Sequence, residues 1–202
     1  MEDFNVFEMM LFTLWIYLPG FLVNTFAMMW GKWLPKTGYG PWPIDGGRLH
    51  KDGNRLLGDG KTWNGLIGGS LTSGLLCYLM TMVPENWIFI SPTEAATGWA
   101  ASAFVLGTFL GFTSLVGDST GSYFKRRKGM KREGDVSSKA PLLDTLPFAI
   151  SVFVFGQLFL TGSNHGDRDL ILPMALLVVI TPILHRSFNL IGYKIGWKDV
   201  PY

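Results

Sequence analysis

The sequence has little cysteine, histidine or charge. Its 202 residues include one cysteine, three histidines and 16% charged residues, whereas about 25% of the residues in a typical soluble domain are charged. The single Cys77 excludes an internal disulfide framework and a cysteine-based zinc site. None of the three histidines has neighbours that suggest a Ser–His–Asp nucleophile set. The first ten residues, MEDFNVFEMM, are acidic, which is the wrong sign for a secretory signal peptide.

Charge is also absent from long apolar runs. Residues 9–31, 62–84, 95–117 and 145–166 contain no charged side chain, and residues 170–185 form a shorter run of the same kind. About 20 mostly apolar residues span a bilayer as a helix. The sequence therefore predicts an all-α integral membrane protein, built as a single membrane-embedded domain over residues 1–202. Its five transmembrane helices are expected at about 7–31, 64–84, 95–117, 142–162 and 170–188, with long loops at about 32–63 and 118–141.

The basic residues gather on one side of these predicted helices. Of the 17 Lys and Arg residues, Arg168 alone falls in a segment assigned to the other side. Because cytoplasmic loops carry an excess of Lys and Arg, the N-terminus is predicted to lie outside. Both long loops and the C-terminus are then cytoplasmic, and the protein is expected in the cell membrane, multi-pass, with its active site facing the cytoplasm.

Small residues recur at four-residue spacing inside the predicted helices. Such pairs allow two helix backbones to approach closely, so helix packing is their expected role. The pairs are Gly65 and Gly69, Ser70 and Gly74, and Gly107 and Gly111.

Two aspartates lie at the predicted cytoplasmic interface. Asp118 follows the third apolar run, where the C-terminal end of a helix disfavours a carboxylate. It could instead cap a new helix that begins near Ser119, or it could bind a cation. Asp144 stands at the start of the fourth helix, where the same two interpretations, cap and ligand, apply.

Basic residues lie between these two aspartates in the chain. Two carboxylates with Lys and Arg nearby suit a Mg²⁺–polyphosphate site, because Mg²⁺ is usually held by one or two carboxylates together with phosphate oxygens and water. Lys125, Arg126 and Arg127 would bind the phosphates. The alternative for this segment, KRRKGMKR, is a positive anchor on anionic lipid.

The first long loop contains the segment GDGKT, residues 58–62. It is not a P-loop, because Arg55 stands where that motif requires glycine and no strand is predicted before it. Gly60, Lys61 and Thr62 nevertheless precede the second helix, whose N-terminus could form an anion cradle with Lys61. The alternative is a glycine-rich turn in which Thr62 caps the helix.

The stretch GDSTGSYFKRRKGMKREGD…APLLDTLPF resembles the signature of the phosphatidate cytidylyltransferases. Ser122, Lys125 and Arg126 match the Ser-x-x-Lys-Arg core of that family, and Asp144 matches its later aspartate. The usual His-Gly-Gly stretch is absent, and Thr-Leu-Pro replaces Arg-x-Asp after Asp144. These departures resemble the shorter archaeal branch, the CDP-archaeol synthases, as do the DGG segment that begins at Asp45 and GDGKTW in the first loop.

This resemblance implies an enzyme that transfers CMP from CTP to the phosphate of 2,3-bis-O-(geranylgeranyl)glycerol 1-phosphate, giving CDP-archaeol and pyrophosphate. Its expected partners are CTP, the lipid phosphate and membrane lipids, without a nucleic-acid polymer, and its expected cofactor is Mg²⁺. Asp118 and Asp144 are then the metal ligands and, with Lys125 and Arg126, the catalytic residues. The expected nucleotide-binding residues are Asp45, Gly60, Lys61, Thr62, Ser122, Lys125, Arg126 and Arg127.

Two other functions remain open on the residues alone. One is a membrane phosphotransferase that acts on another nucleotide or on a polyprenyl phosphate. The other is a non-enzymatic, polybasic lipid-binding module. A transporter is disfavoured, because none of the five apolar runs has a charge at its centre.

Overall fold

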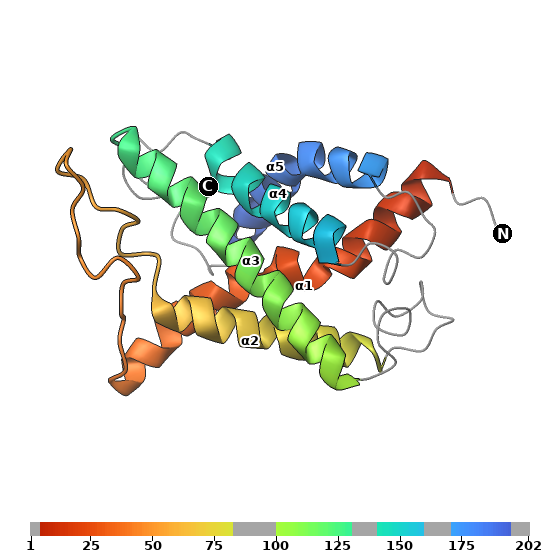
Figure 1. The fold of residues 1–202 in the computed structure, drawn as a ribbon, viewed down its shortest axis with the longest axis horizontal. Helices are drawn as coiled ribbons and strands as arrows, with labels where there is room; N and C mark the ends of the chain where they lie inside the picture. The colour runs from red at the N-terminus through yellow and green to blue at the C-terminus, as the bar shows by residue number, and fades with distance from the viewer. Residues whose placement is uncertain (1–4, 83–99, 131–140, 160–170, 195–202) are drawn as a thin grey trace.

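The structure is a computed structural model that describes residues 5–82, 100–130, 141–159 and 171–194 (Figure 1). This part of the chain is helical, and its β pairing is confined to two single bridges in the first loop. The prediction of an all-α fold is therefore confirmed for the described residues. The elements are α1 (Val6–Trp33), the short 3₁₀ helix η1 (Leu34–Thr37), α2 (Trp63–Met80), α3 (Ala100–Arg127), α4 (Pro141–Phe159) and α5 (Ile171–Lys194).

The first two helices begin at polar caps that the sequence supplies. Asn5 and Glu8 form a capping box at the start of α1, which satisfies backbone N–H groups that have no partner within the helix. Thr62 caps α2 by accepting a hydrogen bond from the backbone N–H of Gly65 at 3.1 Å. The first apolar residues of each helix follow directly after the cap, so the caps fix where the chain passes from loop to helix.

The helices α1 to α4 alternate in direction along the chain (Figure 1). The end of α1, the start of α2, the end of α3 and the start of α4 consequently lie toward one end of the molecule, where the first loop also lies. Side chains from four helices form the larger of two apolar core clusters, and Val23, Leu66 and Leu115 of α1, α2 and α3 form the other. The buried members of the larger cluster are Phe12, Ile16 and Tyr17 of α1, Leu110 of α3, Val152 and Phe153 of α4, and Met174 and Leu177 of α5.

The small residues in the helices lie at close helix contacts, as predicted. A Cβ atom added at Gly74 of α2 would lie 2.6 Å from the carbonyl oxygen of Phe104 in α3. One added at Gly107 of α3 would lie 2.8 Å from the carbonyl oxygen of Ser73. One added at Gly69 would lie 3.0 Å from the backbone nitrogen of Ala27 in α1. The glycines therefore set the spacing between α1, α2 and α3.

The outer faces of the helices are apolar. Large hydrophobic side chains are exposed along α2, α3, α4 and α5, among them Leu75, Leu79, Phe109, Phe112, Val154, Leu158, Val179 and Ile183. Apolar surface of this extent is rare on a soluble monomer. By length and hydropathy, Val6–Thr37 and Ala103–Arg127 could each cross a membrane, and Leu142–Leu158 and Ile171–Ile183 are shorter apolar helices.

Exposed aromatic residues lie where the first loop joins α1 and α2. They are Trp30, Trp33, Tyr39, Trp42 and Trp63. Trp and Tyr concentrate at membrane–water interfaces, where the ring is partly apolar and the N–H or O–H group stays wet. The five side chains therefore fit a membrane surface at this end of the molecule.

The prediction that the third helix ends at Gly117 and a loop begins at 118 is wrong. α3 continues for ten more residues, to Arg127. No proline interrupts this stretch, and the signal that ends the helix is Gly129, which has a φ of +68°. Glycine just beyond a helix end is a common stop, because it adopts this left-handed conformation without strain. The backbone N–H of Met130 then bonds to the carbonyl of Lys125 at 3.0 Å.

Smaller differences concern the other helix boundaries. α2 ends at Met80 rather than near 84, and α5 continues to Lys194 rather than ending near 188. The predicted start of the third helix at 95 and the predicted end of the fourth at 162 lie outside the described residues.

Candidate active site

Two lysine–aspartate pairs lie at the end of the molecule that carries the first loop. Lys61, just before α2, forms an ion pair with Asp118 of α3. The extension of α3 explains this contact, because Asp118 lies within a continuous helix and is therefore not the cap of a new one. The pair joins two segments that are 57 residues apart in the chain.

The second pair joins α3 to α4. Lys125 of α3 donates to Asp144, which lies in the first turn of α4. Only 7% of the Lys125 side chain and 15% of the Asp144 side chain are exposed. A charge removed from water to this degree is stable only when it is paired, so each residue of the pair requires the other.

Close packing of α3 on α4 brings these residues together. A Cβ atom added at Gly121 would lie 2.4 Å from the carbonyl oxygen of Leu143, the residue before Asp144. Asp118 and Lys125 are seven residues apart on α3, which is about two helical turns and places both on nearly the same face. The two ion pairs therefore follow one side of the C-terminal part of α3.

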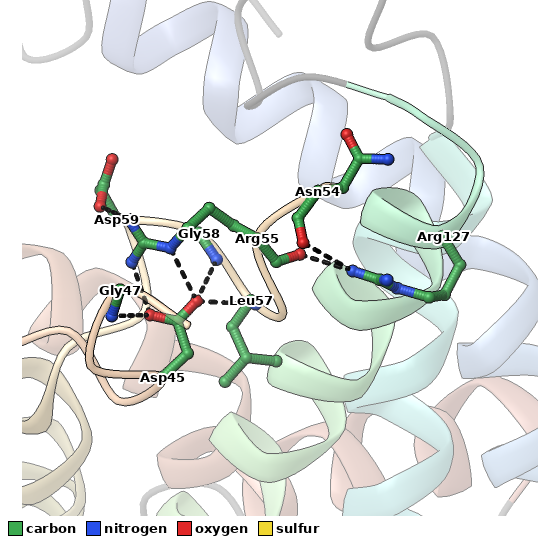
Figure 2. Close-up of polar contacts among 8 residues, drawn as sticks. All are labelled: Asp45, Gly47, Asn54, Arg55, Leu57, Gly58, Asp59 and Arg127. Carbon is green, nitrogen blue, oxygen red and sulfur yellow. Dashed lines mark hydrogen bonds and ion pairs between the residues drawn. The ribbon is translucent and has the colours of Figure 1, made fainter. Parts of the chain in front are cut away.

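The carboxylate of Asp45 organises the first loop, and Figure 2 shows its contacts. One oxygen accepts hydrogen bonds from Arg55 Nη2 at 2.5 Å and from the Gly47 N–H at 3.2 Å. The other accepts from Arg55 Nε at 3.2 Å and from the N–H groups of Leu57 and Gly58 at 3.0 and 3.1 Å. Both oxygens are therefore used within the loop.

These contacts control the ionisation of Asp45. Burial alone would raise the pKa of this carboxyl, but the hydrogen bonds from Arg55 and from the backbone of Leu57, Gly58 and Gly47 outweigh it. The pKa is held well below its ordinary value, because each donor stabilises the charged form. The same contact raises the pKa of Arg55. Arg55 also pairs with the exposed Asp59, at 2.6 Å.

Arg127 connects the end of α3 to the same loop (Figure 2). Its Nη1 donates to both carboxylate oxygens of Asp52 at 2.8 Å, and its Nη2 donates to the carbonyl of Arg55 at 2.6 Å. Its guanidinium also lies 5.1 Å from the centre of the Tyr123 ring. The backbone N–H of Asn54 lowers the pKa of Asp52, and the charge of Arg127 adds to this effect. Arg127 thus fixes the loop onto α3.

The remaining nucleotide-binding candidates lie around these contacts. Thr62 is the buried cap of α2, and Gly60 lies in the turn that leads to it. Ser122 is buried on α3. Arg126 donates to the carbonyl of Met130, and its Nε lies 3.1 Å from the place of a Cβ added at Gly58. The structure therefore brings Lys61, Asp118, Lys125, Arg126 and Asp144 to one end of the molecule.

An open hollow of about 420 Å³ lies between the first loop and α3. Asp45 and Arg48 are the charged residues of its lining. The lining residues are Ile44, Asp45, Gly46, Arg48, Leu56, Leu57 and Tyr123.

Sequence reasoning missed several residues that build the site. Arg55 counted only as the residue that breaks the P-loop spacing, yet Arg55 and Asp52 both hold the loop in place. Asn64 of α2 was also missed. It accepts from the N–H of Trp42 at 3.2 Å and donates to the carbonyl of Tyr39 at 3.0 Å. Alternating charges in the loop were the available signal, but they do not specify which pairs form.

The residues present fit a divalent cation of the magnesium type. The described chain contains no group of three or more His, Cys, Asp or Glu side chains that could enclose a metal ion. Mg²⁺ does not need such a cage, because one or two carboxylates with phosphate oxygens and water complete its octahedron. Asp118 and Asp144 supply two carboxylates at one end of the helix pair, each of them next to a lysine.

A family model described as CarS-like, CDP-archaeol synthase, matches residues 6–202. The chain belongs to the CDP-archaeol synthase family. It is 36% identical to the CDP-archaeol synthase of Thermococcus gammatolerans, with 96% of each chain covered. It is 37% identical to that of Thermococcus onnurineus, with 96% of this chain and 97% of the relative covered. It is 36% identical to the CDP-archaeol synthase of Methanosarcina barkeri, with 92% of this chain and 99% of the relative covered.

A solved structure also resembles this member of the CDP-archaeol synthase family. It is described as an intramembrane enzyme for archaeal membrane lipids biosynthesis. The two chains are 26% identical, the TM-score is 0.59, and the match covers 88% of this chain and 92% of the other. The comparison agrees with the apolar outer faces of the helices, and together they identify a membrane protein.

Proposed function

We propose that this protein transfers CMP from CTP to the phosphate of an archaeal diether lipid, 2,3-bis-O-(geranylgeranyl)glycerol 1-phosphate. A lipid phosphate oxygen forms a bond to the α-phosphorus of CTP, and the bond from that phosphorus to the bridging oxygen of the β-phosphate breaks. The products are CDP-archaeol and pyrophosphate. Membership of the CDP-archaeol synthase family supports this reaction and disfavours the phosphotransferase and the lipid-binding module.

The observation that carries the site assignment is the pair of lysine–aspartate contacts along α3. A lipid phosphate is already an anionic nucleophile, so the protein needs no strong base and no nucleophile of its own. Its contribution is to position two anions against each other and to neutralise their charge. Lys61, Lys125 and Arg126 supply the positive charge for the triphosphate and the leaving pyrophosphate.

Asp118 and Asp144 would hold Mg²⁺, which would neutralise negative charge on the phosphate oxygens of the nucleotide. Both carboxylates are paired with lysines in the described chain. The ion pairs with the lysines hold these carboxylates in place at the site. When the nucleotide binds, the same lysine side chains become available to its phosphate oxygens.

The site lies at the cytoplasmic surface of a five-helix membrane bundle with its N-terminus outside. The exposed aromatic residues near the first loop support a membrane surface at this depth, and the concentration of Lys and Arg at this end supports the cytoplasmic side. The lipid reaches the site from within the bilayer, with its chains against the apolar outer faces of the helices.

Transfer of label from CTP tests the reaction. The purified protein is incubated with Mg²⁺, the lipid phosphate and CTP labelled at the α-phosphate, and the expected product is a labelled lipid. CTP labelled at the γ-phosphate is expected to leave the lipid unlabelled. Label that reaches the lipid from the γ position would identify a phosphotransferase and contradict the proposal.

Asparagine variants test the metal ligands in the same assay. Asp118→Asn and Asp144→Asn keep the side-chain shape but remove the charge, and each is expected to abolish CMP transfer. Glu8→Gln is the control. It removes a carboxylate from the first turn of α1, whereas the site lies toward the C-terminal end of that helix. Transfer at the wild-type rate by either asparagine variant would contradict the metal assignment.

A further inference from the structure

The last turn of α3 carries three consecutive basic residues, Lys125, Arg126 and Arg127. The sequence groups them as one cluster, but the helix separates their side chains, because each residue of an α-helix is turned by about 100° from the one before. Arg127 is therefore turned by about 200° from Lys125, which shares its face of α3 with Asp118. Arg127 thus leaves α3 on a different side from the two lysine–aspartate pairs.

The donors of Arg127 are used within the protein. A guanidinium has five N–H donors. Nη1 donates to both carboxylate oxygens of Asp52 at 2.8 Å. Nη2 donates to the carbonyl of Arg55 at 2.6 Å and, at 3.5 Å, to that of Asn54 (Figure 2). Nε is buried and has no hydrogen-bond partner among the described residues. A phosphate oxygen would therefore have to displace an existing contact in order to bind this side chain.

The surroundings of Arg127 also cover its guanidinium. The ring centre of Tyr123, one helical turn earlier, lies 5.1 Å from the guanidinium carbon, which is a cation–π distance. Only 16% of the Arg127 side chain is exposed. Lys128, the next residue, is exposed, so the end of the helix does not by itself bury a side chain. The contacts with Tyr123 and with the first loop are what cover Arg127.

A series of hydrogen bonds leads from Arg127 to Lys61. Arg127 holds the carbonyl of Arg55, whose guanidinium is bound to Asp45. Asp45 accepts from the N–H of Gly58 at 3.1 Å, and the carbonyl of Gly58 accepts from the N–H of Lys61 at 3.3 Å. A displacement at Arg127 is therefore transmitted to Lys61 through three residues of the loop.

The segment that carries Asp45 also fixes Lys61 from its other side. The carbonyl of Lys61 accepts from the N–H of Ile44 at 2.8 Å, and Ile44 directly precedes Asp45. The side chain of Lys61 meanwhile pairs with Asp118 of α3. The place of the Lys61 ammonium thus depends on how the Asp45 segment sits against α3, and Arg127 fixes that segment's loop onto the helix.

We infer that Arg127 is a positioning residue: it binds no phosphate, and by fixing the first loop on α3 it places Lys61 for the triphosphate. The inference rests on the proposed function, in which Lys61 supplies positive charge to the triphosphate. A lysine cannot take the place of Arg127, because an ammonium is a point charge without the planar fork that binds a carboxylate and a carbonyl together. Arg127 therefore acts through another residue, whereas Lys125 and Arg126 act on the substrate.

Substitutions at Arg127 measure its role through the Kd for CTP in the presence of Mg²⁺. Arg127→Met removes the donors, and Arg127→Lys keeps the charge without the fork. Both are expected to raise the Kd by about tenfold or more, the usual effect of losing hydrogen bonds to a charged group. A wild-type Kd in Arg127→Lys would show that only the charge matters, as for a phosphate contact, and would overturn the inference.

A double-mutant cycle with Lys61 shows whether Arg127 acts through it. Lys61→Met is expected to raise the Kd for CTP by about tenfold or more. Adding Arg127→Met is expected to change that Kd by less than about twofold, because the lysine that Arg127 positions is already absent. Multiplication of the two single effects would mean that the residues contact the nucleotide independently, and would overturn the inference.

Exchange of charges between Arg127 and Asp52 is a second test. Arg127→Asp combined with Asp52→Arg restores the ion pair in the reverse direction, so the double variant is expected to bind CTP more tightly than Arg127→Asp alone. If Arg127 bound a phosphate, a carboxylate in its place would repel the nucleotide with or without the second substitution. A double variant that binds CTP no better than the single one would therefore overturn the inference.

Lys128→Met and Lys51→Met are the matched controls. Each removes an exposed cation next to one member of the Arg127–Asp52 pair. Both are expected to change the Kd for CTP by less than about twofold, as is usual for surface substitutions. Hydrogen exchange at the N–H of Lys61 is expected to become faster in Arg127→Met and to stay unchanged in the controls. Unchanged exchange in Arg127→Met would show that the loop is held without this arginine, and would overturn the inference.

The outcomes also distinguish this inference from the proposed function. Independent effects of Lys61 and Arg127, with normal transfer of the α-phosphate label by the wild type, would overturn the inference and leave the function intact. A wild-type protein that binds no CTP would overturn both. Thermal unfolding in detergent identifies folded variants, and Arg127→Lys takes the place of Arg127→Met in every comparison if the methionine variant does not fold.

Discussion

Lys125 of α3 and Asp144 of α4 form an ion pair beside a close contact between these two helices, where Gly121 meets Leu143. The pair lies at the one end of the molecule where the first loop, α3 and α4 come together (Figure 1). Sequence separation hides this relationship, because the lysine and the aspartate are 19 positions apart along the chain. It explains why a lysine on a helix that continues past the apolar run is buried rather than solvated.

Removal of Lys125 is expected to abolish transfer and to destabilise the protein. Lys125→Met leaves Asp144 without its partner at a site where 15% of the side chain is exposed. Removal of one partner from a fully buried ion pair lowers the free energy of unfolding by about 3–5 kcal/mol. A smaller loss is expected here, because Asp144 keeps some contact with water. Turnover and the midpoint of thermal unfolding in detergent measure the two effects.

Lys128→Met is the matched control for this variant. Lys128 lies just beyond the end of α3 and is exposed. Its loss is expected to leave the unfolding midpoint and turnover nearly unchanged, as for most surface charges. Equal effects of the two substitutions would show that only total positive charge matters, as an anchor on anionic lipid would require.

Exchange of the charges in the Lys61–Asp118 pair separates a structural contact from a ligand. If the two residues only hold the first loop against α3, the double variant Lys61→Asp with Asp118→Lys restores the pair and the activity. We expect each single variant to lose activity and the double variant to regain thermal stability but no CMP transfer, because the carboxylate has moved. Stability and transfer assays on the four proteins form a double-mutant cycle.

The Mg²⁺ concentration at half-maximal rate gives a second measure for this site. Asp118→Glu keeps the charge but moves the carboxylate, so it is expected to need more Mg²⁺ and to retain weak transfer. Recovery of transfer by the charge-exchanged double variant would contradict the proposed role of Asp118 as a metal ligand.

The contacts of Asp45 predict a pH dependence of the first loop. The folded pKa of this carboxyl lies below the unfolded value of about 3.9. Its stabilising contribution is therefore fully present above about pH 4 and is lost as the pH falls through the folded pKa. Asp45→Asn is expected to weaken the loop at every pH above about 4, and to reduce the loss of stability on acidification.

Hydrogen exchange reports on this loop directly. The N–H groups of Leu57 and Gly58 donate to Asp45, so their exchange is expected to become faster in Asp45→Asn. Asp59→Asn is the control, since Asp59 binds the same arginine but is 75% exposed. Unchanged protection of Leu57 and Gly58 in Asp45→Asn would show that other contacts hold the loop.

Composition and periodicity predicted much of this fold, and the reasons are physical. Runs such as 9–31 lack charge and must be helical if they cross a bilayer, because lipid leaves no other partner for the backbone. Small-residue spacing predicted the packing at Gly74 and Gly107. The error at Gly117 came from equating the end of an apolar run with the end of a helix. Asp118, Ser122 and Lys125 are polar, yet the helix continues because they have partners or are covered by α4 and the loop.

The site was less predictable than the helices. The sequence supplied the candidates Asp118, Lys125 and Asp144, and the resemblance supplied their roles. The sequence could not supply the pairing of these residues, because the positions of Lys61 and Asp52 depend on how the loop between η1 and α2 returns onto α3. Ion pairs between distant segments depend on tertiary contacts, and a charge pattern alone is compatible with many pairings.

The final prediction concerns the contact that sets the position of Asp144. Gly121→Ala adds a methyl group that would lie 2.4 Å from the carbonyl oxygen of Leu143, so α4 must move away from α3. Overpacking of this kind typically costs about 1–3 kcal/mol. The displacement also separates Lys125 from Asp144, so transfer is expected to fall more than the loss of stability explains. Gly31→Ala is the control, because its added methyl group would meet only Thr62 Oγ1, at an ordinary 3.6 Å. Alanine favours a helix over glycine by about 1 kcal/mol, so this control is expected to be neutral or slightly stabilising, with normal transfer. Transfer at the wild-type rate by Gly121→Ala would show that the reaction does not depend on the close approach of the two helices.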